Sequence, residues 1–407
     1  MSRLQPMVAL SALAVLGLAC WALAAAPRGG TGAQPQPAAA PPRWPYVVVD
    51  TGQTTCTDDR GRVVAPQPGQ PYYGQDAQYQ GPQPAYRNNG DGTVTDLNTG
   101  LTWVQARGAK VTWEAARTGA AACHIGGYTD WRMPTIKELY SLINFAGGYH
   151  ITAEASRPYL DTRFFAFVYG DEARGERLID CQDWSATRYV STTMGGSPTA
   201  FGVNFADGRI KGYPIVRPGP RGGEHTLYVR YVRGNPDYGR NDFHDNGDGT
   251  ITDQATGLMW QQGDSGATCD WPGALAYAES LALAGHDDWR LPNAKELQSL
   301  VDYTRSPATT GTAAIDPLFT VTKVESWYWT GTTHLEGPPD HSGSAAVYVC
   351  FGRAWGYMFG QWLDVHGAGA QRSDPKTGDP AAYGYSRGPQ GDQVRIQNYV
   401  RCVRGGA

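Results

Sequence analysis

The stretch Asn89-Gly90-Asp91-Gly92-Thr93-Val94-Thr95-Asp96 decides the fold, because it recurs as Asn246-Gly247-Asp248-Gly249-Thr250-Ile251-Thr252-Asp253. Asn and Gly tolerate the positive φ angles of tight hairpin turns, so both stretches predict a β-hairpin. The residues that follow each turn alternate between polar and apolar side chains, as in a half-buried strand. Each stretch therefore opens one of two related segments.

The repeat extends well beyond these hairpins. The further blocks that recur in the same order are Thr99-Gly100-Leu101-Thr102-Trp103 with Thr256-Gly257-Leu258-Met259-Trp260, Asp130-Trp131-Arg132-Met133-Pro134 with Asp288-Trp289-Arg290-Leu291-Pro292, Lys137-Glu138-Leu139 with Lys295-Glu296-Leu297, and Tyr228-Val229-Arg230-Tyr231-Val232-Arg233-Gly234 with Tyr399-Val400-Arg401-Cys402-Val403-Arg404-Gly405. Chance does not preserve the order of so many blocks. The chain therefore contains two copies of a module of roughly 150–170 residues.

The second copy shows the expected order of elements most clearly. Apolar residues recur at helical spacing over residues 271–284, which predicts an amphipathic helix. Asn293 is placed as an N-cap, and Glu296 three residues later completes a capping box at the start of a second helix. Short strands are expected around 329–333, 348–351 and 399–403, so that the two ends of the module meet in one sheet. This order predicts an α+β fold.

Composition excludes two classes of protein. The chain has 407 residues and a formal net charge of −4, whereas a nucleic-acid binder is usually basic. It contains 52 Gly and 28 Pro, but without the triplet period of collagen. We therefore expect a turn-rich globular protein with no nucleic-acid partner.

The N-terminus has the pattern of a secretory signal. Arg3 precedes an apolar run, and small residues before residue 27 offer a cleavage site, so residues 1–26 are predicted to be a signal peptide. The alternatives are a retained membrane anchor and lipidation at Cys20, but Gly17 is the wrong residue at position −3 of a lipoprotein box. Residues 27–45 are rich in Ala, Pro, Gly and Gln and predict a disordered linker. We expect no membrane span in the mature chain.

Cleavage would remove Cys20 and leave six of the seven cysteines. An even number in an oxidising compartment indicates up to three disulfides, although six cysteines allow about 15 pairings. Zinc is a poor alternative, because no Cys-x-x-Cys pair or spaced His partner is present.

The repeated blocks resemble the Lcl C-terminal domain family, a domain named from a bacterial collagen-like adhesin. The blocks Asn-Gly-Asp-Gly-Thr-x-Thr-Asp, Thr-Gly-Leu-x-Trp, Trp-Arg-x-Pro-x-x-x-Glu-Leu and Val-Arg-x-Val-Arg carry the resemblance over residues 86–405. It implies two tandem C-type-lectin-like modules at residues 86–235 and 241–407, after an N-terminal extension at 46–85. In the founding adhesin the domain binds sulfated polysaccharides, but this chain lacks collagen-like repeats.

The resemblance also suggests disulfide partners. In lectin-like domains one disulfide joins the region of the first helix to the last strand, which implies Cys269–Cys402 as the leading pair, with Cys350 as a competing partner. In the first copy the position of Cys402 is occupied by Tyr231, so Cys123 is expected to pair with Cys181 or Cys56.

The acidic residues of the two hairpin turns are also candidates for calcium binding. An EF-hand loop is rejected, because its twelfth position would be Ala255 or Asn98 rather than Glu. A looser calcium site remains as an alternative to a purely structural turn. Its candidate ligands are Asp91, Asp96, Asp248 and Asp253.

The two copies differ in a long polar insertion between Arg353 and Tyr399 of the second copy. Ordered loops on a rigid scaffold often carry function, so this insertion is the candidate ligand site, against the alternative of a solvated or copy-packing loop. The candidate ligand residues are Asp364, His366, Gln371, Arg372, Asp374, Lys376 and Asp379. The first copy has only Asn204, Asp207, Arg209 and Lys211 in the corresponding place.

Two other sets of residues have a functional and a structural interpretation. The Trp-Arg dipeptides at 131–132 and 289–290, with Glu138 and Glu296, could form a sugar platform, but we expect Trp in the core and Arg paired with Glu. The arginine pairs could bind sulfate if exposed, but structural pairing with carboxylates of the chain is an equal alternative. These pairs are Arg230 with Arg233 and Arg401 with Arg404.

No nucleophile elbow, metalloprotease motif, Walker loop or dinucleotide pattern is present, so we expect a protein that is not an enzyme. The leading hypothesis is an exported bacterial binding or adhesion protein, periplasmic, secreted or at the cell surface, that recognises glycans or surface polymers. One alternative is a structural or assembly subunit that binds protein partners or itself. The other is an uncharacterised enzyme that uses the long loop of the second copy. No cofactor is expected apart from the calcium alternative.

Overall fold

A computed structural model describes residues 44–217, 222–384 and 388–405 of the chain. The predicted signal peptide, most of the predicted linker and Cys20 lie outside the described residues. No helix in the described part of the chain is long and apolar enough to cross a membrane. The fold is α+β, as predicted, with many strands and few short helices.

Each copy begins with the predicted hairpin, and each hairpin belongs to a four-stranded antiparallel sheet. The first sheet has the order β11-β5-β4-β3 and consists of β3 (Tyr86–Asn88), β4 (Thr93–Asp96), β5 (Thr102–Val104) and β11 (Val232–Arg233). The second has the order β12-β13-β14-β20 and consists of β12 (Phe243–Asp245), β13 (Thr250–Asp253), β14 (Leu258–Gln261) and β20 (Val403–Gly405). In both copies the last strand returns to the first hairpin, as expected.

The turn of each hairpin is held by its own side chains. Asp91 Oδ1 accepts hydrogen bonds from the amide of Thr93 at 3.0 Å and from its hydroxyl at 2.6 Å. Gly90 and Gly92 have φ angles of 79° and 84°, which other residues adopt at a cost. Asp248 repeats these contacts with Thr250.

Each copy contributes two α-helices, namely α1 (Trp113–Gly119) and α2 (Ile136–Ser141) in the first copy and α3 (Trp271–Ser280) and α4 (Ala294–Ser299) in the second. The predicted capping box at Asn293 is confirmed, and Thr135 forms the same box in the first copy. The helix predicted over 271–284 ends at Ser280, because Leu283 and His286 instead exchange backbone hydrogen bonds.

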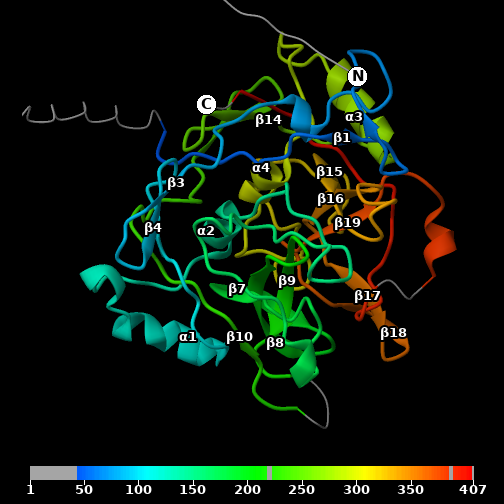
Figure 1. Ribbon diagram of the computed structural model, residues 1–407. Helices are drawn as coiled ribbons and strands as arrows, with labels where there is room; N and C mark the ends of the chain where they lie inside the picture. Colours follow the sequence, from blue (N-terminus) through cyan, green and yellow to red (C-terminus); the bar gives the residue numbers. More distant parts are fainter. Residues whose placement is uncertain (1–43, 218–221, 385–387, 406–407) are drawn as a thin grey trace, which may run out of the picture. The chain divides into compact units, whose positions relative to one another are not determined.

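The two copies share one six-stranded antiparallel sheet, with the order β15-β16-β19-β9-β8-β7 (Figure 1). The first copy supplies β7 (Asp183–Thr193), β8 (Ser197–Asn204) and β9 (Arg209–Pro214), and the second supplies β15 (Trp327–His334), β16 (Ala345–Cys350) and β19 (Gln371–Pro375). The strand order mirrors itself about the β9–β19 pair. Because that central pair is antiparallel, the two halves follow a pseudo-twofold arrangement.

The strand predicted at 399–403 begins only at Val403. Asn398 and Tyr399 form single bridges with Cys269 and Tyr328, which tie this segment to other parts of the second copy. The strands predicted around 329–333 and 348–351 are confirmed as parts of β15 and β16.

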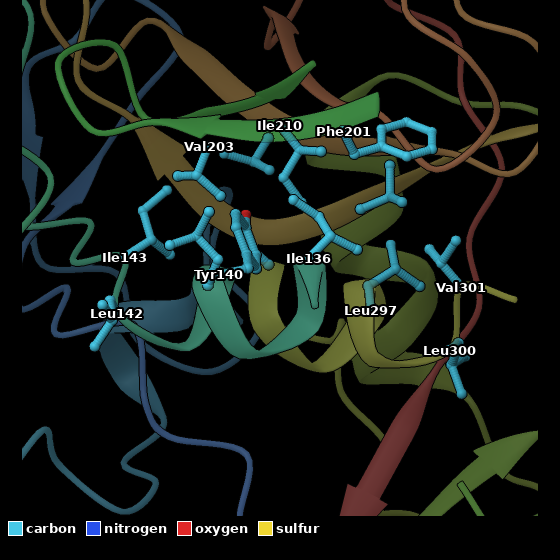
Figure 2. Close-up of a cluster of buried hydrophobic side chains, with 14 of the residues drawn as sticks. Ile136, Tyr140, Leu142, Ile143, Phe201, Val203, Ile210, Leu297, Leu300 and Val301 are labelled. Atoms are coloured by element: carbon cyan, nitrogen blue, oxygen red, sulfur yellow. The ribbon is translucent and has the colours of Figure 1, made fainter. Parts of the chain in front are cut away.

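One hydrophobic core covers one face of the shared sheet. In Figure 2, Ile136 and Tyr140 of α2 lie next to Leu297 of α4, and both helices face Val203 and Ile210 of the sheet. These residues are at most 1% exposed and belong to a single buried cluster drawn from both copies. The modules are therefore not two separately packed units within residues 42–407.

The remaining strands form three two-stranded sheets. They are β1 (Cys56–Thr57) with β2 (Val63–Val64), β6 (Val111–Thr112) with β10 (Thr226–Leu227), and β17 (Trp355–Met358) with β18 (Gln361–Asp364). Single-turn 3₁₀-helices occur at Asp76–Gln78, Ala120–Ala122, Ile125–Gly127, Glu172–Arg174 and Pro380–Tyr383.

The N-terminal extension contacts both copies. The amide of Phe145 in the first copy donates to the carbonyl of Thr51 at 2.8 Å. Gln53 exchanges two hydrogen bonds of 2.8 Å with the backbone of Thr333 in the second copy. The extension thus ties the two copies together.

The disulfide predictions are wrong for this structure, in which all six cysteines of the described residues are free: Cys56, Cys123, Cys181, Cys269, Cys350 and Cys402. Cys269 and Cys402 pack in one hydrophobic cluster but are not bonded, and the Cys269 thiol approaches the carbonyl of Asn398 at 4.0 Å. The Cys181 thiol lies 3.7 Å from the carbonyl of Leu178, whereas Cys123 is partly exposed at the end of a 3₁₀-helix. Burial raises the pKa of Cys181 to about 12, so this thiol is protonated at neutral pH.

Candidate functional site: a cavity between the two copies

A cavity of about 1140 Å³ lies where the two copies meet, and we call it the seam cavity. The residues that define it are Asp207, Arg209, Lys211 and Tyr213 from the first copy and Glu336, His366, Arg372, Ser373, Asp374 and Asp392 from the second. Drug-sized ligand pockets occupy about 300–1,000 Å³, so the seam cavity has room for a ligand of several rings.

Strand alternation explains the wall from the first copy. Ile210 of β9 packs into the hydrophobic core, and successive strand residues point to opposite faces. Arg209, Lys211 and Tyr213 therefore occupy the opposite face of the sheet, where they line the cavity.

Asp207 connects the cations of this wall. Its Oδ2 lies 2.6 Å from the Lys211 ammonium and 3.5 Å from the Arg209 guanidinium. Burial raises the pKa of the Asp207 carboxyl, but Lys211 and Arg209 outweigh it, so this pKa lies below its ordinary value. Burial lowers the pKa of Lys211 to about 8, although Asp207 acts in the opposite direction.

Arg209 reaches across the seam into the second copy. Its guanidinium pairs with Glu336 and donates to the hydroxyl of Ser373 at 2.9 Å. Ser373 in turn donates to Glu336 at 2.8 Å, and His334 lies 3.1 Å from the same hydroxyl. This network holds β9 against the second copy through Arg209 and Glu336, whose side chains are 10% and 18% exposed.

The wall from the second copy is centred on Asp392. Its Oδ1 accepts from His366 Nε2 at 3.1 Å, and its Oδ2 pairs with Arg372. Burial, followed by the positive charges of Arg372 and Lys211, lowers the pKa of His366 well below its usual value. Burial and repulsion by Arg209 lower the pKa of Arg372 to about 10.

Asp374 positions the loop that carries Asp392. Its Oδ2 accepts from the amides of Arg395 and Ile396 at 2.9 and 3.0 Å. Ile396 has a φ of 58°, an uncommon conformation for a β-branched residue. The two hydrogen bonds that Asp374 accepts therefore hold a strained turn directly after the lining residues Asp392 and Gln393.

Five of the buried side chains at the cavity carry polar atoms that have no hydrogen-bond partner among the described residues. These atoms are Asp207 Oδ1, Arg209 Nε, Tyr213 OH, His366 Nδ1 and Arg372 Nη1. Buried polar groups in native proteins almost always have partners. This concentration marks the floor of the seam cavity as a place where further hydrogen bonds can form.

The candidate ligand residues of the long insertion are divided by the structure. His366, Arg372 and Asp374 line the seam cavity. Asp364 accepts from the hydroxyl of Tyr189 at 2.7 Å, and burial raises the pKa of its carboxyl to about 6. Asp379 caps the 3₁₀-helix that begins at Pro380.

The two remaining candidates of that set also contact the chain itself. Gln371 is fully buried, and its amide donates to the carbonyl of Arg372 at 3.2 Å. Lys376 is fully buried and donates to the carbonyl and hydroxyl of Thr57, both at 2.8 Å.

The candidate calcium ligands hold turns. Asp91 and Asp248 accept from the threonines of their hairpins, as described above. Asp96 accepts from the amides of Asn98 and Thr99, and Asp253 accepts from four groups around it. The described residues contain no group of three or more His, Cys, Asp or Glu residues placed to hold a metal ion.

The repeated Trp-Arg motifs are structural, as expected. Arg132 pairs with Glu138 at 2.5 Å and Arg290 with Glu296 at 2.6 Å, and the adjacent tryptophans are at most 5% exposed. Arg230 is buried and donates to backbone carbonyls, and Arg401 does the same in the second copy. Arg233 and Arg404 pair with Asp130 and Asp288.

Sequence reasoning missed Asp392, Glu336 and Tyr213. Asp392 lies within the insertion, but nothing in its local sequence distinguishes it from its polar neighbours. A signal was present in the first copy, where Asp207, Arg209 and Lys211 alternate at strand spacing. A charged strand face of this kind must meet solvent or a charged partner, and here it meets the second copy.

The profile of the Lcl C-terminal domain matches residues 92–233 and 249–366, more than half of the chain. The chain belongs to the Lcl C-terminal domain family. The predicted tandem arrangement of two copies is thereby confirmed. The second match ends at His366, so the Lcl C-terminal domain profile does not cover the cavity residues Arg372 to Asp392. No curated protein and no solved structure matches the chain.

Proposed function

We propose that the chain is an exported bacterial binding or adhesion protein whose C-type-lectin-like modules hold a glycan or surface polymer in the seam cavity. The single observation that carries the proposal is the set of five unpartnered buried polar atoms at this cavity. A polar ligand that enters the floor would give these atoms the partners that the chain does not supply.

The placement of the cavity supports the same function. It lies between the two copies, on the face of the shared sheet opposite α2 and α4, and its walls are formed by strands and by the loop that Asp374 holds. Binding sites need such a rigid frame because positioning groups in advance reduces the entropic cost of association.

A glycan array with the purified full-length protein tests the proposal, and it should include neutral and sulfated polysaccharides. We expect saturable binding that falls at least tenfold in Arg372→Met. The matched control is Arg163→Met, because Arg163 is 82% exposed, pairs with Asp161 and does not line the cavity. Absence of saturable binding to any member would overturn the proposal.

A second candidate function, assembly through protein contacts, has one specific observation in its favour. The tip of the β17–β18 hairpin carries Phe359, which is 71% exposed with a φ of 54°, and Trp362 nearby is 39% exposed. Sedimentation velocity distinguishes this function, since it predicts concentration-dependent association that Phe359→Ser removes. A monomer at all concentrations would contradict self-assembly.

A further inference from the structure

The three buried cations of the seam cavity are each paired with a carboxylate of the chain, whereas Arg217 also lines the cavity and is exposed. Lys211 pairs with Asp207, Arg209 with Glu336, and Arg372 with Asp392. An anionic ligand would have to displace one of these carboxylates or lie against it. Removing a buried carboxylate from its cation is costly, so the described part of the cavity does not favour an added negative charge.

The unpartnered atoms comprise both donors and acceptors. Arg209 Nε and Arg372 Nη1 can only donate, whereas Asp207 Oδ1 can only accept when ionised. The hydroxyl of Tyr213 can do either.

The tautomer of His366 adds a second acceptor. The Asp392 carboxylate only accepts, so His366 Nε2 must carry the hydrogen of their contact. Burial and the neighbouring cations keep the imidazole neutral, which leaves a lone pair on Nδ1. Nδ1 makes no hydrogen bond to the described residues, and although the backbone of Gly212 acts on the ring, the Nδ1 lone pair can accept from a ligand.

A hydroxyl group matches this mixture, because it donates one hydrogen bond and accepts others. A sulfate or carboxylate group only accepts, so it could satisfy the arginines but would leave Asp207 and His366 facing negative oxygen atoms.

We infer that the seam cavity selects uncharged, hydroxyl-rich saccharides and discriminates against their sulfated counterparts. Asp207 and His366 accept from ligand hydroxyls, and Arg372 donates to them. The inference rests on the proposed function and specifies its ligand class, which differs from that of the founding adhesin of the family.

The test uses isothermal titration of the full-length protein with neutral gluco-, manno-, galacto- and N-acetylglucosamine oligosaccharides and with sulfated forms of the same oligosaccharides. We expect a neutral member to bind at least tenfold more tightly than its sulfated form. Binding should change less than twofold between 50 and 500 mM salt, because no net charge is neutralised.

Two variants separate the alternatives. Asp207→Asn should weaken neutral binding at least fivefold, whereas an anion site would bind its ligand more tightly once this negative charge is removed. Tyr213→Phe removes a hydroxyl that has no partner among the described residues, so this variant should fold normally. It should still weaken the binding of neutral oligosaccharides severalfold.

Tighter binding of the sulfated forms, or stronger binding by Asp207→Asn, would overturn the inference and leave the proposed function standing. Unchanged binding in both variants would also overturn it. Binding to no oligosaccharide, neutral or sulfated, would overturn the inference together with the proposed function.

Discussion

Ile210 of the first copy lies directly opposite Gln371 of the second in antiparallel register, and this pair joins the two halves of the six-stranded sheet. Each residue is fully buried. The contact between the copies is thus part of the core rather than a surface added later.

Ile210→Ala should lower the free energy of unfolding by about 2–5 kcal/mol, because it leaves a cavity where both copies pack. Urea unfolding followed by fluorescence measures this loss, and we expect both copies to unfold in one transition. Ile125→Ala is the control, since Ile125 is 39% exposed and should cost well under about 1 kcal/mol. Two separate transitions would contradict a shared core.

Glu296→Ala should lower the free energy of unfolding by about 3–5 kcal/mol. The change leaves the guanidinium of Arg290 without its carboxylate and removes the capping bond that the amide of Asn293 donates to Glu296. Glu114→Ala removes the exposed pair with Arg117 and should cost about 1 kcal/mol or less. Equal losses of unfolding free energy in the two variants would show that the buried pair stabilises the fold no more than the exposed pair.

Asp76 should make stability depend on pH. Burial raises the pKa of its carboxyl to about 7, even though Thr332 and Thr51 donate hydrogen bonds to it. The folded state therefore binds this proton more tightly than the unfolded state, whose pKa is near 3.8. The stability contributed by the protonated carboxyl is complete below pH 4 and is lost as the pH rises toward 7.

Asp76→Asn replaces the titratable carboxyl with an amide of nearly the same shape. We expect the variant to gain stability relative to the parent protein as the pH rises from 5 to 8, by an upper limit of about 4 kcal/mol. Thermal unfolding of both proteins at several pH values measures the difference. A constant difference across this range would contradict a raised pKa.

Lys376 distinguishes a structural from a ligand-binding role within the long insertion. Lys376→Met should cost about 2–3 kcal/mol, because it removes the buried hydrogen bonds that the ammonium donates to the carbonyl and hydroxyl of Thr57. Glycan affinity should remain within twofold of the parent value, since Lys376 does not line the seam cavity. Lost affinity with unchanged unfolding would assign this lysine to the ligand instead.

The local elements could be predicted from the sequence because their causes are local. The Asn-Gly-Asp-Gly turns, the capping box at Asn293 and the Arg290–Glu296 pair each depend on residues within a few positions of one another. The long insertion could be identified as the place where the copies differ, and His366, Arg372 and Asp374 do line the cavity.

The seam could not be predicted in the same way. Pairing of β9 with β19 joins residues about 160 positions apart in the chain, and either strand could have been a sheet edge on its sequence alone. The meeting of Asp207, Arg209 and Lys211 with Asp392 follows only from that pairing. The free thiols of Cys269 and Cys402 depend likewise on distances that the spacing of cysteines does not fix.

The mirrored strand order has one further consequence. In a homodimer with such a twofold axis both subunits have the same sequence, so the two half-sites are identical. A substitution in one half-site would then change both. Here the two halves are encoded separately, so the equivalent positions that follow Ile210 and Gln371 carry different side chains, Lys211 in β9 and Arg372 in β19. Linking the copies in one chain thus lets a pseudo-symmetric scaffold present two different walls to the same cavity.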